Sequence, residues 1–238
     1  MPILPLALEP NPSMRSRDEV SNLARSLTLV EPRPASLPPE LPDRLDDDYL
    51  VFLRDTNGGY TPDRMFHFFG ASGPPEHDVI HWNHVDLWKK HFGLDDQCFV
   101  FAEDVFGNQY YYALGTRRRM VRILCFDDGS STSCASDFQG FIGNVVLNEE
   151  VTREYFRVMD QLLRATGSPY PLFTHVSSKV PSCLGGDDRD VDNLEFANSI
   201  DHLNFMGQIV KQTEVLPPGT VVRDVVLDPA TGELKLVI

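Results

Sequence analysis

The sequence has few cysteines and lacks the short motifs that bind metal ions or phosphate groups. Its four cysteines are scattered over 238 residues, and no two of them form a C-x-x-C pair. This pattern excludes a zinc-binding framework and is too sparse for a disulfide-stabilised scaffold. The chain also has no H-E-x-x-H, G-x-S-x-G or G-x-x-x-x-G-K-[ST] sequence, which zinc proteases, serine hydrolases and P-loop proteins carry. We therefore expect reduced thiols, no cofactor and no metal.

Positive charge is also scarce. The chain has 21 basic and 35 acidic side chains, which leaves a net charge of −14. A nucleic-acid backbone would be repelled by this field, so direct nucleic-acid binding is not expected. The acidity suits a basic partner, but solubility alone would also account for it.

Long apolar runs are absent. No stretch approaches the roughly 20 apolar residues of a membrane-spanning helix. The mildly apolar N-terminus has no positively charged region before it and is interrupted by Pro5 and Pro10, so it is a poor signal peptide. We expect a cytoplasmic protein without membrane contact.

Proline divides the chain into unlike parts. Nine of the eighteen prolines lie in residues 1–42, where they exclude a long helix or a central strand. One short helix fits there, over Arg17–Leu27. We expect a Pro-rich N-terminal segment over residues 1–40 and a domain over 41–150. The remainder, 151–238, is expected to be a helix and a C-terminal extension that ends in a β-hairpin.

Hydrophobic periodicity predicts the elements of the larger domain. A helix near Asp48 should stop at Asn57-Gly58-Gly59, because glycine accepts positive φ angles. A second helix is expected between Asn83, as its N-cap, and Gly93. Strands are expected over residues 64–70, 98–104, 108–114 and 120–126, and the short turns between the last three predict antiparallel hairpins.

Further helices are predicted over residues 136–146, 149–167 and 198–212. The middle one is strongly amphipathic, with a single apolar stripe. The members of that stripe are Val151, Tyr155, Phe156, Met159, Leu162 and Leu163.

Several segments together resemble the SUKH superfamily, which contains a fungal cell-wall-assembly regulator and many bacterial toxin-immunity proteins. The matching stretches are LPDRLDDDYLVFLRDTNGGY, HWNHVDLWKKHFGLDDQCFVFAEDVFGNQYYYAL and VRILCFDDGSSTSCASDFQGFIGNVV, within residues 41–147. Asp137 stands where the family pattern often has Ser. The tail from Lys179 is similar to an extension on some bacterial members, although residues 187–190 replace a more aromatic stretch. The resemblance implies an α+β fold with a mixed, largely antiparallel sheet, flanking helices and a smaller C-terminal α/β extension.

Two groups of residues are interpreted as structural. Asp104 and Asn108 can bond the backbone of a tight turn around Gly107, and Asn57, Gly58 and Gly59 end a helix. The neighbouring Glu103 and Asp104 must point to opposite faces of their strand. They therefore cannot converge as an acid/base pair.

Candidate partner contacts are the acidic loop residues Asp95, Asp96, Asp127 and Asp128, together with Trp82. Carboxylates attract a basic partner, and tryptophan is enriched at binding hot spots. Trp88 fits the buried stripe of its predicted helix instead.

Histidines and nucleophiles give no clear catalytic signal. His77, His81, His84 and His91 lie within fifteen residues, but the predicted cap Asn83 splits them and they lack a ligand spacing. We interpret them as hydrogen-bonded or exposed. The serines and Cys134 of the 127–136 segment have no evident base partner in sequence.

The resemblance implies a binding role and no reaction: an immunity protein that neutralises a cognate toxin. That toxin is expected to be basic, and a nuclease is one candidate because nucleases bind a polyanion. A regulatory or scaffold module for a cellular partner is the alternative. A third hypothesis is a hydrolase assembled from His or Cys residues that are distant in sequence.

Overall fold

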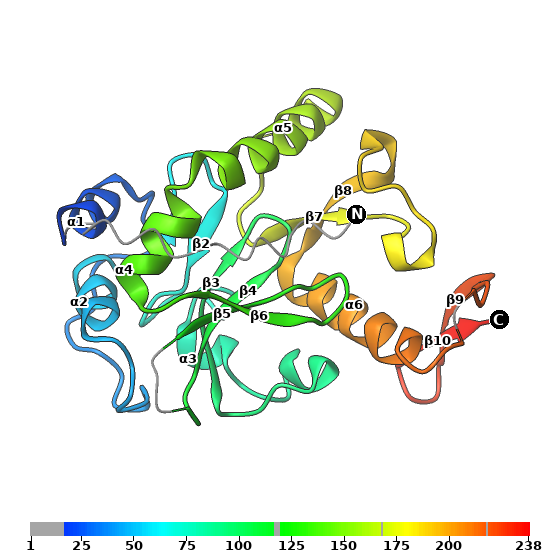
Figure 1. Cartoon of the computed structure of the whole chain (residues 1–238), viewed down its shortest axis with the longest axis horizontal. Helices are drawn as coiled ribbons and strands as arrows, with labels where there is room; N and C mark the ends of the chain where they lie inside the picture. The colour runs from blue at the N-terminus through cyan, green and yellow to red at the C-terminus, as the bar shows by residue number, and fades with distance from the viewer. Residues whose placement is uncertain (1–16, 117–119, 168, 218) are drawn as a thin grey trace.

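The computed structural model describes residues 17–116, 120–167, 169–217 and 219–238. Its centre is a six-stranded sheet whose strands follow one another in sequence order, every neighbouring pair being antiparallel (Figure 1). The α+β class and the largely antiparallel sheet predicted from the sequence are therefore confirmed. The strands are β1 (Gly59–Tyr60), β2 (Phe66–Phe68), β3 (Cys98–Asp104), β4 (Gln109–Ala113), β5 (Val121–Leu124) and β6 (Ser131–Ala135).

Helices surround this sheet. The longest two in the described part of the chain are α5 and α6, of 18 and 15 residues. Among the described residues the α-helices are α1 (Arg17–Ser26), α2 (Asp47–Thr56), α3 (Val79–Trp82), α4 (Phe138–Phe141), α5 (Glu149–Thr166) and α6 (Ser199–Thr213). Shorter 3-10 turns are η1 (Lys89–Phe92), η3 (Ser182–Leu184) and η4 (Val191–Asn193), and η2 (Ile142–Val146) is a π-helical continuation of α4. No helix in the described ranges is both long and apolar enough to cross a membrane.

Aromatic rings form the core between the sheet and helices α2 and α4. The ring centroid of Tyr49 lies 5.3 Å from that of Phe101, and Phe101 lies 5.2 Å from Phe141. Phe52 and Phe138 pack beside them at 5.2 Å. Such rings bury large apolar areas, which explains how a chain with this acidic balance stabilises its interior.

Asn57 ends α2 and joins it to two loops. Its backbone has a φ of 60°, and its Oδ1 accepts the N–H of Ala71 at 2.7 Å, while its Nδ2 donates to the carbonyl of Pro32 at 3.0 Å. Gly58 follows with a φ of 68°, and a Cβ there would lie 2.3 Å from the carbonyl oxygen of Phe68. Glycine is therefore required at this close approach to β2.

The expectation of one helix from Asn83 to Gly93 was wrong. α3 ends at Trp82, Asn83 is its C-cap, and the chain then makes turns before η1. Trp82 and Trp88 are both fully buried with ring centroids 5.9 Å apart. Asn83 instead bonds the sheet, because its side chain donates to the Val100 carbonyl and accepts the Val100 N–H.

The stripe predicted for α5 is correct at Val151, Tyr155, Met159 and Leu162, which are buried. Phe156 is 58% exposed and does not belong to the buried stripe, whereas Val158, which was not predicted, is buried. Phe156 lies one position after Tyr155, about 100° around the helix, and therefore points away from the core.

The C-terminal extension packs against the sheet through elements that the sequence analysis missed. Strands β7 (Thr174–Ser178) and β8 (Leu194–Asn198) form an antiparallel pair, and the Val176 N–H donates to the Val105 carbonyl at the end of β3. The predicted terminal hairpin is present as β9 (Asp224–Leu227) and β10 (Leu234–Val237). Figure 1 shows this hairpin projecting beyond α6, away from the central sheet.

Candidate functional site

The turn between β3 and β4 is held by Asp104, as the sequence predicted. Its Oδ1 accepts the N–H groups of Phe106 and Asn108 at 3.0 and 3.1 Å, and its Oδ2 accepts the Asn108 side-chain amide at 2.8 Å. Tyr110 and Tyr155 also donate their hydroxyls to Oδ2, at 3.1 and 2.9 Å. Burial raises the pKa of Asp104 while these donors lower it. Asp104 therefore fastens α5 to the sheet and has a structural role.

Glu103 points to the other face of the sheet and is also buried. Its Oε1 lies 3.0 Å from Nδ1 of His67, and its Oε2 lies 3.0 Å from Nε2 of His175. The Gln109 side-chain amide donates to Oε2 at 3.0 Å. Burial alone would raise the pKa of Glu103, but the facing His175 and His67 lower it to about 2. A carboxylate is thus stabilised inside the protein by donors on both of its oxygens.

One branch of this network runs through His67 to His77. Nε2 of His67 lies 2.9 Å from Nδ1 of His77, and Nε2 of His77 lies 2.8 Å from the carbonyl oxygen of Asn57. Burial and the nearby His67 lower the pKa of His77 to about 3. His77 is therefore neutral near pH 7.

The other branch runs into the C-terminal extension. Nδ1 of His175, on β7, lies 3.0 Å from Nδ1 of His202, on α6. His202 is 3% exposed, and its Nε2 has no hydrogen-bond partner among the described residues. Burial and His175 together lower the pKa of His202 well below its ordinary value, so this ring is also neutral.

The acceptors at the first branch fix where its protons lie. The Asn57 carbonyl can only accept, so the neutral His77 carries its proton on Nε2 and accepts at Nδ1 from His67. His67 must also donate from Nδ1 to the Glu103 carboxylate. Both ring nitrogens of His67 are therefore occupied, one by the Glu103 carboxylate and one by His77.

The second branch joins the extension to the same carboxylate. His175 donates from Nε2 to Glu103. One proton is shared between Nδ1 of His175 and Nδ1 of His202, since two ring nitrogens in contact need one donor and one acceptor.

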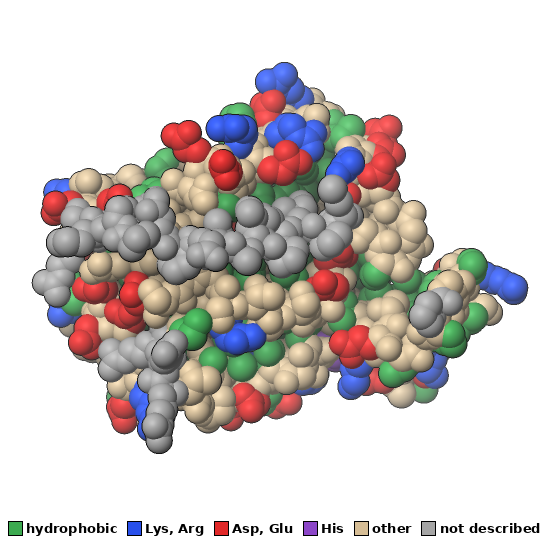
Figure 2. Space-filling model, in the orientation of Figure 1, with side chains coloured by type: hydrophobic (Ala, Val, Ile, Leu, Met, Phe, Trp, Pro, Cys, Tyr) green, Lys and Arg blue, Asp and Glu red, His purple; other side chains and the backbone are tan. Residues whose placement is uncertain are grey.

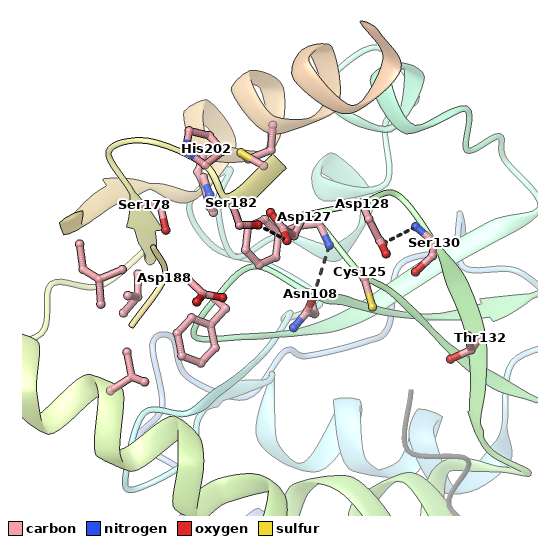
Figure 3. Close-up of a pocket in the computed structure, with 17 residues that line it drawn as sticks. Asn108, Cys125, Asp127, Asp128, Ser130, Thr132, Ser178, Ser182, Asp188 and His202 are labelled. Atoms are coloured by element: carbon pink, nitrogen blue, oxygen red, sulfur yellow. Dashed lines mark hydrogen bonds between the residues drawn. The ribbon is translucent and has the colours of Figure 1, made fainter. Parts of the chain in front are cut away.

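A pocket of about 360 Å³ lies where the sheet meets the extension, and His202 is part of its wall (Figure 3). The sheet contributes the turns after β3 and β5, and the extension contributes β7, β8, α6 and the loop before η3. Apolar side chains of this wall include Phe106, Phe126, Val158, Leu194 and Met206. The pocket is thus bounded by segments more than 90 residues apart in sequence.

The remaining walls of the pocket are acidic. Asp127, Asp128 and Asp188 line it, and none of its described lining residues is Lys or Arg. Asp127 accepts the Ser182 hydroxyl at 2.7 Å, and Asp128 accepts the Ser130 N–H at 2.8 Å (Figure 3). Fixed carboxylates beside apolar walls produce a negative field that favours a cationic, partly apolar ligand.

The four acidic residues singled out from the sequence do not gather in one place. Asp127 and Asp128 follow β5 and line the pocket, whereas Asp95 and Asp96 precede β3. β3 and β5 run in the same direction because both are antiparallel to β4, so the two pairs lie at opposite ends of the sheet. Figure 2 likewise shows acidic side chains in several separate groups on the face it displays.

Trp82 does not lie at a surface, and the interpretation of this residue as a partner contact was wrong. Its exposed fraction is 0%, and its indole N–H donates to the Gln109 side chain at 2.9 Å. This bond also orients the Gln109 amide towards Glu103. Trp82 thus bonds the Oε1 atom of Gln109, while the Nε2 atom of the same amide bonds Glu103.

The histidine cluster predicted from sequence is divided. His77 belongs to the buried network, whereas His81 and His84 are exposed and His91 is half-buried. In the described ranges no group of three or more His, Cys, Asp or Glu side chains is arranged to hold a metal ion.

All four cysteines are free thiols. Cys125 lines the pocket, and burial raises its pKa. Burial also raises the pKa of Cys134 to about 12 and that of Cys183 to about 11. These thiols stay protonated near pH 7, a state in which cysteine is a poor nucleophile.

Sequence reasoning missed His67, His175 and His202. His67 lies inside the apolar run RMFHFFG, and His202 shares the buried face of α6 with Met206 and Ile209. A titratable residue inside an apolar pattern signals a buried polar contact. That signal was present, but it does not reveal the partner.

Comparison with known proteins identifies the central segment. Residues 39–144 match the model of the SMI1 / KNR4 family (SUKH-1). The chain is also similar to a solved structure, Atu4351 from Agrobacterium tumefaciens, with 15% sequence identity and a TM-score of 0.51. That match covers 90% of this chain and 96% of the other, and at this identity it shows likeness of fold alone. No curated protein matches the chain.

Proposed function

Because residues 39–144 belong to the SUKH superfamily, we propose that this chain is an immunity protein that acts in the cytoplasm. It binds a cognate bacterial toxin and occludes it without carrying out a reaction. The proposal combines the family assignment with the surface chemistry of the pocket end of the molecule.

The observation that carries the proposal is the acidic pocket between the sheet and the extension. Carboxylates of Asp127, Asp128 and Asp188 stand beside apolar walls, and no Lys or Arg is present among its described lining residues. An apolar centre with a charged rim is the usual anatomy of a protein-binding surface. The sign of the charge favours a basic partner, such as a toxin that acts on nucleic acid.

The titratable groups support binding over catalysis. The Glu103 carboxylate is buried and bonded to His67, His175 and Gln109, and its neighbour Asp104 is occupied by the turn and two tyrosines. The cysteine thiols are protonated near pH 7. A general base would need a reachable, correctly poised group, and a nucleophile would need an activated one.

Co-expression with the product of the adjacent gene tests the proposal. Growth should be restored when this chain is present, and the two proteins should co-purify. Charge reversal at the pocket, Asp127→Lys with Asp128→Lys, should weaken rescue, whereas Asp95→Lys with Asp96→Lys at the other end of the sheet is the matched control.

Two outcomes would contradict the proposal. If a toxic neighbouring product is neither neutralised nor co-purified, the chain is not its immunity protein. Co-purification with a non-toxic cellular protein would instead favour a regulatory or scaffold module.

A further inference from the structure

Two histidines of the extension meet at the end of the central sheet. Nδ1 of His175, on β7, lies 3.0 Å from Nδ1 of His202, on α6, and Nε2 of His175 bonds the Glu103 carboxylate of β3. The exposed fractions of the two histidines are 1% and 3%, so both rings are buried. α6 is thus connected, through His202 and His175, to a carboxylate of the sheet.

This contact limits the number of protons that the two rings can hold. Two separate imidazolium rings carry two N–H protons each, so they hold four in total. Two Nδ1 atoms 3.0 Å apart have room for one hydrogen between them, so the pair in contact holds at most three, whichever ring owns the shared proton. A separated histidine in water gains its second proton at about pH 6.5. Separation of the rings is therefore accompanied by uptake of at least one proton in mild acid.

The direction of the pH dependence follows from this difference. Burial and the neighbouring His175 lower the pKa of His202 well below its ordinary value, so the buried ring stays neutral where a separated ring is charged. The attached state binds fewer protons than the detached state. Its stability is therefore fully present above about pH 6.5 and is lost as the pH falls below that value.

The two rings differ in what else retains them. His175 keeps the Glu103 carboxylate as a partner, and the adjacent Val176 N–H donates to the Val105 carbonyl of the sheet at 2.8 Å. His202 is bonded through His175, and its Nε2 has no partner among the described residues. A further proton on the pair therefore moves His202, and with it α6, away from the sheet.

Other titratable groups surround the pair. His91, on η1, packs against α6 at Gly207, and burial followed by Lys90 and Lys211 lowers its pKa while Glu233 raises it. His91 is therefore a second group whose pH dependence has the same sign. The remaining charged or titratable side chains near the pair or its carboxylate are His67, Tyr60, Tyr170, Asp127, Asp128 and Asp188.

We propose that the His175–His202 contact is a proton-dependent attachment, which keeps α6 against the sheet near neutral pH and releases it when the pair gains a further proton in mild acid. His202 and Met206 of α6 line the acidic pocket, so release of α6 removes one of its walls. No toxin partner is needed for this behaviour. One proton of difference makes the detached population rise about tenfold for each pH unit.

Hydrogen exchange of the full-length protein, followed by NMR between pH 7.5 and 5, tests the proposal. The reporters are the amides of Leu203 and Met206, because a detached helix of 15 residues is marginal in water. After correction for the intrinsic exchange rate, their protection should fall about tenfold per pH unit below about pH 6. It should depend less on urea than the protection of Tyr111 in β4, because detachment exposes less surface than unfolding.

Two variants assign the effect to one histidine. His202→Asn keeps a polar group that can donate or accept at the position of Nδ1 but does not titrate, so α6 protection should change less than about twofold per pH unit. His91→Gln is the matched control at the same helix and should keep the tenfold dependence. If His202→Asn does not fold, the ring 15N shifts of the parent carry the test, because His202 should stay neutral down to pH 5 wherever α6 is protected.

Three results would overturn the proposal: α6 and β4 amides that exchange together at every pH, α6 protection that does not change with pH, or a dependence that His91→Gln removes. A protonated His202 ring in molecules whose α6 remains protected would do the same. Failure of toxin neutralisation at every pH would contradict the proposed function and leave these measurements unchanged.

Discussion

The Nε2 atom of His175 lies 3.0 Å from the Glu103 carboxylate, so a residue of the C-terminal extension satisfies a charge buried in the central sheet. Asp104, the next residue, accepts the hydroxyl of Tyr155 from α5. Both carboxylates are 3% exposed or less. Both acids lie in the segment that matches the family model. Each has a hydrogen-bond partner in the part of the chain that follows this segment.

This dependence predicts how truncated chains behave. A fragment of residues 39–148 leaves Glu103 and Asp104 without His175 and Tyr155 and uncovers the apolar face that packs on α5. It should lack a cooperative urea transition in circular dichroism. A chain that ends at Thr220 loses only the hairpin β9–β10 and should unfold cooperatively. A fragment as stable as the full chain would contradict the dependence.

The histidine network predicts loss of stability in mild acid. Folded His77 has a pKa of about 3, whereas in the unfolded chain an ordinary histidine binds its proton near pH 6.5. The unfolded state therefore binds more protons as pH falls from 6.5 towards 3, and the free energy of unfolding decreases, by on the order of 4 kcal/mol for this group. Glu103, with its pKa lowered to about 2, adds a loss of the same sign below about pH 4.5.

Denaturation curves of His77→Gln between pH 7.5 and 5 check this assignment. The variant should be less stable at pH 7.5, and its stability should depend less on pH, by close to one proton at the lower end of the range. His81→Gln, at an exposed site, is the control and should keep the parent slope. An unchanged slope in His77→Gln would mean that His77 does not stay neutral in the folded protein.

Two buried tyrosine hydroxyls should respond in opposite ways to removal. Tyr155 donates to Asp104 at 2.9 Å, whereas the hydroxyl of Tyr49 has no partner in the described part of the chain. Tyr155→Phe should lower the free energy of unfolding by about 1–3 kcal/mol, because a buried carboxylate loses a donor. Tyr49→Phe should be neutral or stabilising. Equal effects in urea denaturation would contradict the structural role of Asp104.

Gly107 is predicted to be required for the fit of His175. Its φ is +98°, and an added Cβ would lie 2.7 Å from Nδ1 of His175. Gly93 also has a positive φ, of +67°, but its added Cβ would meet nothing within 4 Å. Gly93→Ala should cost about 1 kcal/mol through backbone strain alone, and Gly107→Ala should cost at least about 2 kcal/mol. Similar melting temperatures for the two variants would argue against the His175 contact.

Local patterns predicted much of this fold. The stripe of α5, the short turns between β3, β4 and β5, and the role of Asp104 in its turn each depend on residues that are close in sequence. A local pattern is therefore enough to predict them. The pairing of β7 with β8 has no local signal of this kind, because a loop rich in Pro, Gly and Asp separates the two strands. They are placed by contacts with the β3–β4 turn and α6.

The candidate site was less predictable than the fold. Glu103, His67 and His202 converge from three distant segments, and no spacing in sequence relates them. Asp127 and Asp128 were identified from their charge, but charge alone did not separate them from Asp95 and Asp96. Because β3 and β5 run in the same direction, the pair that follows β5 and the pair that precedes β3 lie at opposite ends of the sheet.

Binding of a toxin at the acidic pocket is tested most directly by the association rate of the purified chain with its inactivated toxin at low and high salt. Binding at the acidic pocket predicts that Asp127→Asn with Asp128→Asn slows association about tenfold at low salt and flattens its salt dependence. Asp95→Asn with Asp96→Asn should leave both quantities unchanged. Equal rates for the parent and the Asp127/Asp128 variant, or slowing by the Asp95/Asp96 variant instead, would contradict the account.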